Sequence, residues 1–129
     1  MKKNFIIYTL IIFIFTSFSI FAQREVNYGD LKYNEETELV YVEGEKEAFT
    51  GIAKDYYEDK TLKAEVPYVN GLIEGFGKQY YPGGKLKSEA NFVKGLFQGR
   101  ATGYYENGNL ESRIPIRNDV IWGTVENYY

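Results

Sequence analysis

Residues 75–98 read GFGKQYYPGGKLKSEANFVKGLFQ, and this stretch decides the fold. Its first strand-like run enters Pro-Gly-Gly at 82–84, and a Pro-Gly pair between alternating runs is a strong tight-turn signal. From Leu86 to Val93, apolar and polar side chains alternate with a period of two, which is the pattern of a half-buried strand. A helix would need apolar residues three and four apart, and this spacing is absent. The stretch therefore predicts a β-hairpin.

The same pattern returns every 24 residues along the chain. The equivalent positions are Gly51, Gly75, Gly99 and Gly123; Tyr56, Tyr80 and Tyr104; Tyr57, Tyr81 and Tyr105; and Leu62, Leu86 and Leu110. Three full units run over 51–74, 75–98 and 99–122, and residues 123–129 form the first strand of a partial fourth. A single hairpin is marginal in water, so the units must stack. We expect an all-β fold, an elongated open antiparallel sheet of hairpins.

Residues 23–50 form an acidic lead-in and a divergent first unit. Lys32-Tyr33 lies 24 residues before Tyr56-Tyr57, but Leu39 arrives one residue late. Residues 24–47 carry eight acidic and three basic side chains, whereas 48–129 balance at ten each. Nucleic acid and anionic lipid both reward a basic surface. We therefore expect no nucleic-acid partner and no strong binding to an anionic membrane.

The N-terminal segment 1–22 has the features of a secretory signal peptide. Lys2 and Lys3 precede an uncharged run from Phe5 to Phe21, and Ala22 is a small residue at a cleavage point. Cleavage after Ala22 leaves a mature chain with a net charge of −5. We expect a signal helix here and export to the periplasm, cell surface or medium. The alternative is an uncleaved membrane anchor over residues 5–22, which is at the short limit for spanning a bilayer.

The composition removes several classes of chemistry. The chain has no Cys and no His, so it has no disulfide, thiolate nucleophile, imidazole base or zinc site of the usual kind. Glu65 and Glu89 recur on the polar face beside Lys63 and Lys87, where ion pairs between strands are the simplest interpretation. A hydrolase built on those two carboxylates is a remote alternative. We expect a non-enzymatic protein without a cofactor or metal.

The positions of glycine and proline in the turns and strands predict three further features. The hairpin turn at 58–60 lacks Gly, so one of its residues must adopt a positive φ or the turn is longer. Pro67 and Pro115 occupy one repeat position and remove a backbone donor, so the ladder must be interrupted there or face an edge. The Gly that opens each unit is expected to leave room for an aromatic ring on a neighbouring strand.

The paired tyrosines offer a candidate binding surface. Adjacent strand residues point to opposite faces, so one Tyr of each pair is predicted to join the core while the other is displayed. We assign Tyr56, Tyr80 and Tyr104 to the core with Leu62, Leu86 and Leu110, and Tyr57, Tyr81 and Tyr105 to a partner-binding row. Replacing that row by Ala should then weaken partner capture and leave the fold intact. The alternative is a second aromatic layer that only stiffens the sheet.

The repeat resembles the MORN repeat in its bacterial variant form. The resemblance is carried by the runs 81–89 and 92–99, and by the echo at 105–110. It implies an array of hairpins that holds a protein partner as a scaffold. Bacterial proteins of this variant are often antitoxin-like, so the alternative is a neutraliser of a partner protein. The third unit departs from the pattern after Leu110, where Arg113 replaces the Glu and Asn118-Asp119 replaces the Asn/Lys-Gly pair.

The last strand predicts a further contact. Residues 123–129 form a strand with one open side, and such an edge can add a strand from another chain. Dimerisation through this edge, or the addition of a strand from another protein, is therefore a hypothesis.

Overall fold

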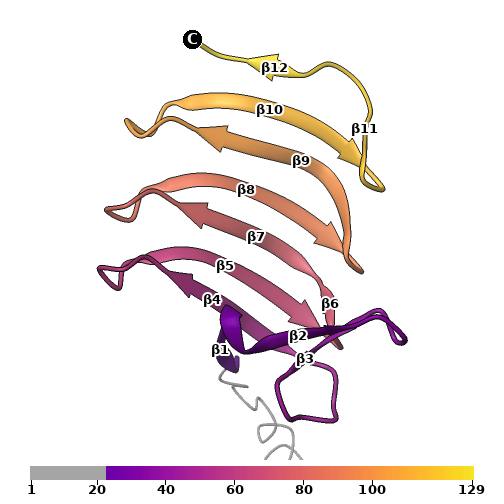
Figure 1. Cartoon of the computed structure of the whole chain (residues 1–129). Helices are drawn as coiled ribbons and strands as arrows, with labels where there is room; N and C mark the ends of the chain where they lie inside the picture. The colour runs from indigo at the N-terminus through magenta and orange to yellow at the C-terminus, as the bar shows by residue number, and fades with distance from the viewer. Residues whose placement is uncertain (1–22) are drawn as a thin grey trace, which may run out of the picture.

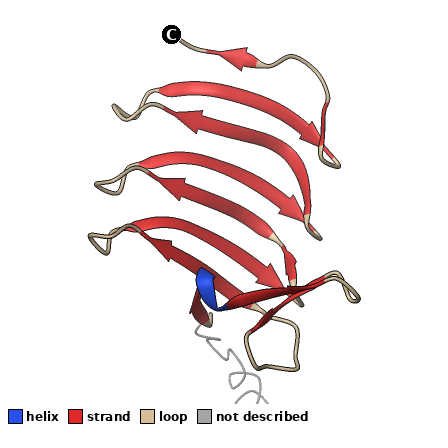
Figure 2. Cartoon of the chain, viewed as in Figure 1, coloured by secondary structure: helices blue, strands red, loops and turns tan. Residues whose placement is uncertain are grey.

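The computed structural model describes residues 23–129, and these residues are almost entirely strands and tight turns (Figure 2). One short 3₁₀ helix, η2, spans Tyr28–Asp30. The strands are β1 (Glu25–Asn27), β2 (Leu31–Asn34), β3 (Leu39–Val42), β4 (Gly51–Tyr56), β5 (Leu62–Val69), β6 (Leu72–Ile73), β7 (Gly75–Tyr80), β8 (Leu86–Val93), β9 (Leu96–Tyr104), β10 (Leu110–Arg117), β11 (Val120–Ile121) and β12 (Glu126–Asn127). This confirms the predicted all-β class.

Hairpins stack side by side into one open sheet of ten strands. Its order is β1-β4-β5-β7-β8-β9-β10-β11, with β6 paired to β5 and β12 paired to β10. Neighbouring strands are antiparallel except for β1, which runs parallel to β4. Figure 1 shows the hairpins rising one above another, with the turns that close β4–β5, β7–β8 and β9–β10 on the same side. The predicted open array of hairpins is confirmed.

The turn that closes each hairpin has the same main-chain hydrogen bonds in all three units, although Gly83 of the middle turn has an additional positive φ of 100°. Positive φ occurs at Lys60 (72°), Gly84 (93°) and Gly108 (88°), which are equivalent positions. Lys60 therefore bears the strain predicted for a turn without Gly. Asp59 stabilises this turn, because its carboxylate accepts hydrogen bonds from the hydroxyl and the main-chain N–H of Thr61, at 2.6 and 2.9 Å. These bonds lower the pKa of Asp59.

A second kind of turn joins one hairpin to the next. Its two central residues both have positive φ in every unit, namely Asn70-Gly71, Lys94-Gly95 and Asn118-Asp119. Two consecutive positive φ angles define the primed turn whose twist matches antiparallel strands. Asp119 thus occupies the glycine position of the third unit at φ 64°. Asp and Asn tolerate this conformation better than most side chains, which explains the substitution.

The two prolines interrupt the neighbouring strand, as predicted. Glu74 separates β6 from β7 and donates its N–H to the carbonyl of Pro67 at 3.1 Å. The break between β11 and β12 lies beside Pro115, whose carbonyl accepts from Trp122 N–H at 3.1 Å. The middle unit has Asn91 at this position, and there β9 continues unbroken with a bulge in its pairing to β8. A missing main-chain donor therefore divides a strand in two.

The buried core lies at one end of the array and is small. Phe49, Ala53 and Tyr68 are the buried hydrophobic residues within 23–129. Partly buried Val26, Leu31, Val40, Val42, Val66 and Ile73 pack against them. The expectation that the recurring tyrosines and leucines form a core in every unit is wrong, since Leu62, Leu86 and Leu110 are only partly buried and Tyr56 is 43% exposed. A single-layer sheet has no second layer to cover them.

The divergent first unit folds as a hairpin but does not continue the main sheet. β2 and β3 pair only with each other, in a two-stranded sheet that Figure 1 shows crossing the end of the array beside β4 and β5. Main-chain hydrogen bonds connect the two sheets, among them Val40 N–H to the carbonyl of Gly71 at 3.0 Å. Side-by-side stacking therefore begins at residue 51. The earlier hairpin instead covers Phe49 and Tyr68.

The glycine that opens each unit serves its backbone conformation. Gly75, Gly99 and Gly123 have φ of 106°, 88° and 102°. A Cβ on Gly75 would meet only Pro67 Cγ at 3.4 Å, and one on Gly99 would meet nothing within 4 Å. At Gly51 a Cβ would overlap the Arg24 carbonyl oxygen and lie 2.9 Å from the ring of Phe49, which precedes Gly51 by two residues and does not lie on a neighbouring strand. Glycine therefore recurs at this position because the main chain has a positive φ there, and not because it leaves room for an aromatic ring.

The predicted signal segment, its helix and the alternative anchor at 5–22 lie outside the described residues. Among residues 23–129, no helix has the length and apolar character to span a bilayer.

The turn analysis predicts that Lys60→Gly stabilises the protein. Glycine removes the Cβ that opposes the left-handed conformation, so the free energy of unfolding should rise by about 1 kcal/mol in urea denaturation. Gly84→Lys, the reciprocal change in the next unit, should lower it. Equal or reduced stability of Lys60→Gly would contradict the assignment of strain to this residue.

Candidate partner-binding surfaces

The tyrosines assigned to a partner-binding row connect adjacent units. The hydroxyls of Tyr57, Tyr81 and Tyr105 donate to main-chain carbonyls at 2.6, 2.8 and 2.7 Å. The acceptors belong to Tyr80, Tyr104 and Tyr128, each 23 residues further along the chain. All three donors are partly buried. Each hydroxyl therefore links its own hairpin to the next unit. Tyr80 and Tyr104 are the last residues of β7 and β9, and Tyr128 follows β12.

The other tyrosine of each pair lies over the polar face. Tyr80 donates its hydroxyl to Glu65 at 2.7 Å, and Tyr104 makes the equivalent long contact to Glu89 at 3.5 Å. In the last unit, Tyr128 lies 3.5 Å from Arg113 and donates to Glu126 at 2.8 Å. In successive units, each of these tyrosines thus contacts the side chain that lies 15 residues before it in the chain.

These contacts correct the predicted division into core and displayed tyrosines. The strand pairing shifts register between Asp55 and Tyr56, and again between Gln79 and Tyr80. The alternation of faces nevertheless holds, because Tyr80 lies two residues after Lys78 and Tyr104 two residues after Thr102, and both of those residues pair with Glu89 on the polar face. The assignment of Tyr80 and Tyr104 to the core is therefore wrong. Tyr57, Tyr81 and Tyr105 bind within the array, and their replacement by Ala should disturb the fold. Their role in holding a partner stays a prediction.

Burial and a carboxylate raise the pKa of two tyrosines. The partly buried Tyr80 hydroxyl loses hydration and donates to Glu65, and together these raise its pKa to about 12. Tyr68 also reaches about 12, chiefly because it is buried, with Tyr28 contributing. In both cases the surroundings favour the neutral phenol over the phenolate.

The polar face holds an ion pair between neighbouring strands at Glu65, as expected, although its partner is Lys78 and not Lys63. Glu65 lies 3.8 Å from Lys78 on the next unit, while Lys63 pairs with Asp55 at 3.0 Å. At the equivalent positions of the last unit the charges are exchanged, and Arg113 lies 4.0 Å from Glu126. The carboxylates of Glu65 and Glu89, the candidates for a hydrolase, thus contact tyrosine hydroxyls, and Glu65 also contacts a lysine. This arrangement fits a structural role.

The opposite, apolar face contains a hollow of about 280 Å³ that crosses a unit boundary. Its lining residues are Ala64, Val66, Ile73, Gly77, Lys78, Gln79, Ser88, Glu89, Ala90, Phe92, Phe97 and Ala101. The rings of Phe92 and Phe97 lie 4.2 Å apart at one side. Three cross-strand neighbours, Gly77, Ala90 and Ala101, are small, which leaves the floor low. Residues from β5 to β9 meet here.

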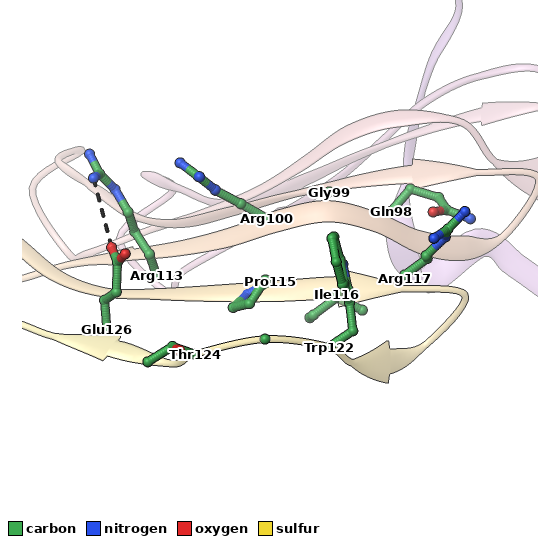
Figure 3. A pocket seen from close by; sticks show the side chains of 11 residues that line it. Gln98, Gly99, Arg100, Arg113, Pro115, Ile116, Arg117, Trp122, Thr124 and Glu126 are labelled. Atoms are coloured by element: carbon green, nitrogen blue, oxygen red, sulfur yellow. Dashed lines mark ion pairs between the residues drawn. The ribbon is translucent and has the colours of Figure 1, made fainter.

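A second hollow, of about 520 Å³, lies on the polar face at the C-terminal unit (Figure 3). Its lining residues are Gln98, Gly99, Arg100, Arg113, Pro115, Ile116, Arg117, Trp122, Gly123, Thr124 and Glu126. The Arg117 guanidinium carbon lies 5.9 Å from the centre of the Trp122 ring, and that ring is 58% exposed. The sequence marked this unit as divergent at Arg113 but did not place these side chains together.

No group of three or more His, Cys, Asp or Glu side chains gathers at a metal-binding spacing within residues 23–129.

A family model describes most of the array. The model for the MORN repeat variant matches residues 49–70, 74–94 and 97–118, so the chain belongs to this family. MORN repeats generally serve in protein interaction or binding, and the repeat is a non-enzymatic type. Searches of curated proteins and of solved structures found no significant match.

The inter-unit hydrogen bonds predict that Tyr81→Phe destabilises the protein. The change deletes only the hydroxyl that donates to Tyr104, so the free energy of unfolding should fall by about 1 kcal/mol in urea denaturation. Tyr33→Phe is the control, because Tyr33 is 63% exposed and its hydroxyl has no hydrogen bond within the described residues. Equal stability of both variants with the wild type would contradict the role of the hydroxyl.

The pKa of Tyr80 predicts alkaline sensitivity. A tyrosine that titrates near 10 when unfolded and at about 12 when folded stabilises the protein fully below pH 10. This stabilisation should be lost as the pH rises from 10 to 12. Ultraviolet titration of tyrosinate should show Tyr80 ionising late, and Tyr80→Phe should remove one late step. Glu65→Gln should bring that step to lower pH, whereas unchanged curves would refute the assignment.

Proposed function

We propose that this is an exported, non-enzymatic scaffold that binds a protein partner across the apolar face of its hairpin array. The hollow between β5 and β9 is the observation that carries this proposal, and the membership of an interaction-repeat family supports it. Export rests on the signal-like sequence of residues 1–22.

The size and lining of the hollow favour a polypeptide partner. At about 280 Å³ it lies just below the ~300–1,000 Å³ typical of pockets that enclose a whole small molecule. It suits one apolar side chain, held between the Phe92 and Phe97 rings and the small residues of β7 and β8. Single apolar anchors of this kind commonly dominate protein interfaces. Gln79 and Ser88 at the same hollow offer polar groups to the adjoining main chain.

The polar face is less suited to this role around the first two full units. Glu65 there is already bonded to Tyr80 and lies near Lys78, so a partner would have to replace existing interactions. On the apolar face, Ala90 and its cross-strand partners Gly77 and Ala101 carry no polar side chain, and Ser88 donates to Gln79 only over a long 3.4 Å. Burial of the exposed apolar surface of this face would be gained without breaking contacts.

This proposal predicts that Ala90→Arg abolishes partner capture. Ala90 lies opposite Gly77 and Ala101, so a long side chain can extend over small neighbours and place a charge in the hollow. In a pull-down from envelope and culture medium, with the mature chain as bait, recovery of the captured protein should fall at least tenfold. Asn91→Arg is the matched control on the opposite face, and it should capture as the wild type does.

Circular dichroism and melting must show both variants folded. Equal capture by Ala90→Arg and the wild type would refute the apolar face as the binding site, and capture of no specific protein by the wild type would refute the scaffold role. N-terminal sequencing of the native protein tests export separately, since a cleaved signal leaves a chain beginning at Gln23.

A further inference from the structure

The third unit departs from the repeat at three surface positions that meet in one place. Arg100, Arg113 and Arg117 stand where the preceding unit has Phe76, Glu89 and Val93. The chain contains four arginines, and three of them line the hollow of the C-terminal unit. Meanwhile the positions that build the hairpin, including Tyr104, Tyr105 and Leu110, keep the repeat. The three arginine substitutions thus gather on one surface while the hairpin positions keep the repeat, and this indicates a local binding task.

These arginines share the polar face. Arg100 and Pro115 are cross-strand partners, as are Gln98 and Arg117, and Arg113 and Arg117 flank Pro115 at a spacing of two. Figure 3 shows Arg100 and Arg113 extending to the same side of the sheet, while Arg117 lies beside Trp122. Glu126 is the single carboxylate in the lining. The hollow therefore has a surplus of positive charge in a chain that is acidic as a whole.

The three guanidinium groups differ in what already binds them. Arg113 lies 4.0 Å from Glu126 and 3.5 Å from the Tyr128 hydroxyl. Arg117 stacks near the exposed Trp122 ring. Arg100 is exposed and makes no hydrogen bond or ion pair within residues 23–129. A guanidinium presents a planar fork that matches a carboxylate with two hydrogen bonds, so Arg100 is positioned to receive one.

Unpaired main-chain groups border the same hollow. The strand that runs beside β10 is broken between Ile121 and Glu126. Within the described part of the chain, the N–H groups of Gly123 and Thr124 make no hydrogen bond, and both residues line the hollow. An extended polypeptide offers carbonyls at the spacing of a strand, which a nucleic acid or polysaccharide does not. The acidic first unit also disfavours a long polyanion such as nucleic acid.

We propose that this arginine hollow binds an acidic segment of a partner protein. Arg100 takes a Glu or Asp carboxylate, Arg117 and Trp122 form the wall beside it, and the segment's main chain pairs with residues 123–124. The site lies on the face opposite the apolar hollow, so it is distinct from the surface of the proposed function. A partner can engage either face without the other.

The first experiment measures fluorescence anisotropy of a labelled decaglutamate peptide with the mature chain. Arg100→Ala should weaken its binding at least tenfold, and Arg117→Val, which restores the residue of the preceding unit, should weaken it several-fold. Lys85→Ala removes one exposed positive charge at a distant turn and should change the affinity less than twofold. Equal loss in Arg100→Ala and Lys85→Ala would overturn the proposal in favour of general charge attraction.

Three further arms distinguish the ligand class. A decaglutamate peptide with N-methyl groups on alternate residues keeps its charge, and unaltered affinity for it would refute the main-chain pairing. Binding of polygalacturonate through Arg100 without binding of decaglutamate would make the ligand an acidic polysaccharide and the proposal wrong. Sedimentation of the chain alone should show no oligomer that depends on Arg100. A salt-sensitive oligomer that Arg100→Ala dissolves would instead place the acidic first unit of a second copy in the hollow.

Ala90→Arg should leave decaglutamate binding unchanged, because Ala90 lies on the opposite face. This variant thereby distinguishes a failure of the arginine hollow to bind its peptide from a failure of the apolar face to bind a partner.

Discussion

A tyrosine hydroxyl bound to a main-chain carbonyl of the following unit is the contact on which the array depends. It recurs three times with nearly the same length, at Tyr57, Tyr81 and Tyr105. Because the sheet is a single layer from residue 51 onward, it cannot bury a central core, and the buried residues of the described chain gather at Phe49 and Tyr68. Cohesion must therefore come from neighbour to neighbour, as in other stacked repeats.

The two faces of this sheet carry different chemistry as a consequence. One face is built from small and apolar side chains, and its hollow forms where Gly77, Ala90 and Ala101 lie next to one another. The other face joins units through polar contacts, such as Tyr80 to Glu65. In the C-terminal unit the charges on the polar face are exchanged. Arg113 occupies the repeat position of Glu65 and Glu89, and Glu126 occupies that of Lys78. The frame is constant while its surface varies.

The first hairpin shows how the array begins. β2 and β3 leave the plane of the main sheet and cover the ring of Phe49, while β1 pairs in parallel along the outer edge of β4. An uncovered edge strand and an uncovered aromatic ring would both invite association. The acidic residues of this unit keep its own surface charged. At the other end, β12 has a partner in β10 alone among the described strands, and this leaves its outer side open.

The sequence by itself determined what depends on local rules. The step of 24 residues, the Gly-containing turns, and the breaks beside Pro67 and Pro115 all follow from the dihedral preferences and missing donors of single residues. Only the tertiary structure decided what each tyrosine hydroxyl binds, since the acceptors of Tyr57 and Tyr80 lie 23 and 15 residues away in the chain. It alone decided that the first hairpin covers Phe49, and that side chains from five strands leave one hollow, because both depend on contacts between segments far apart in the chain.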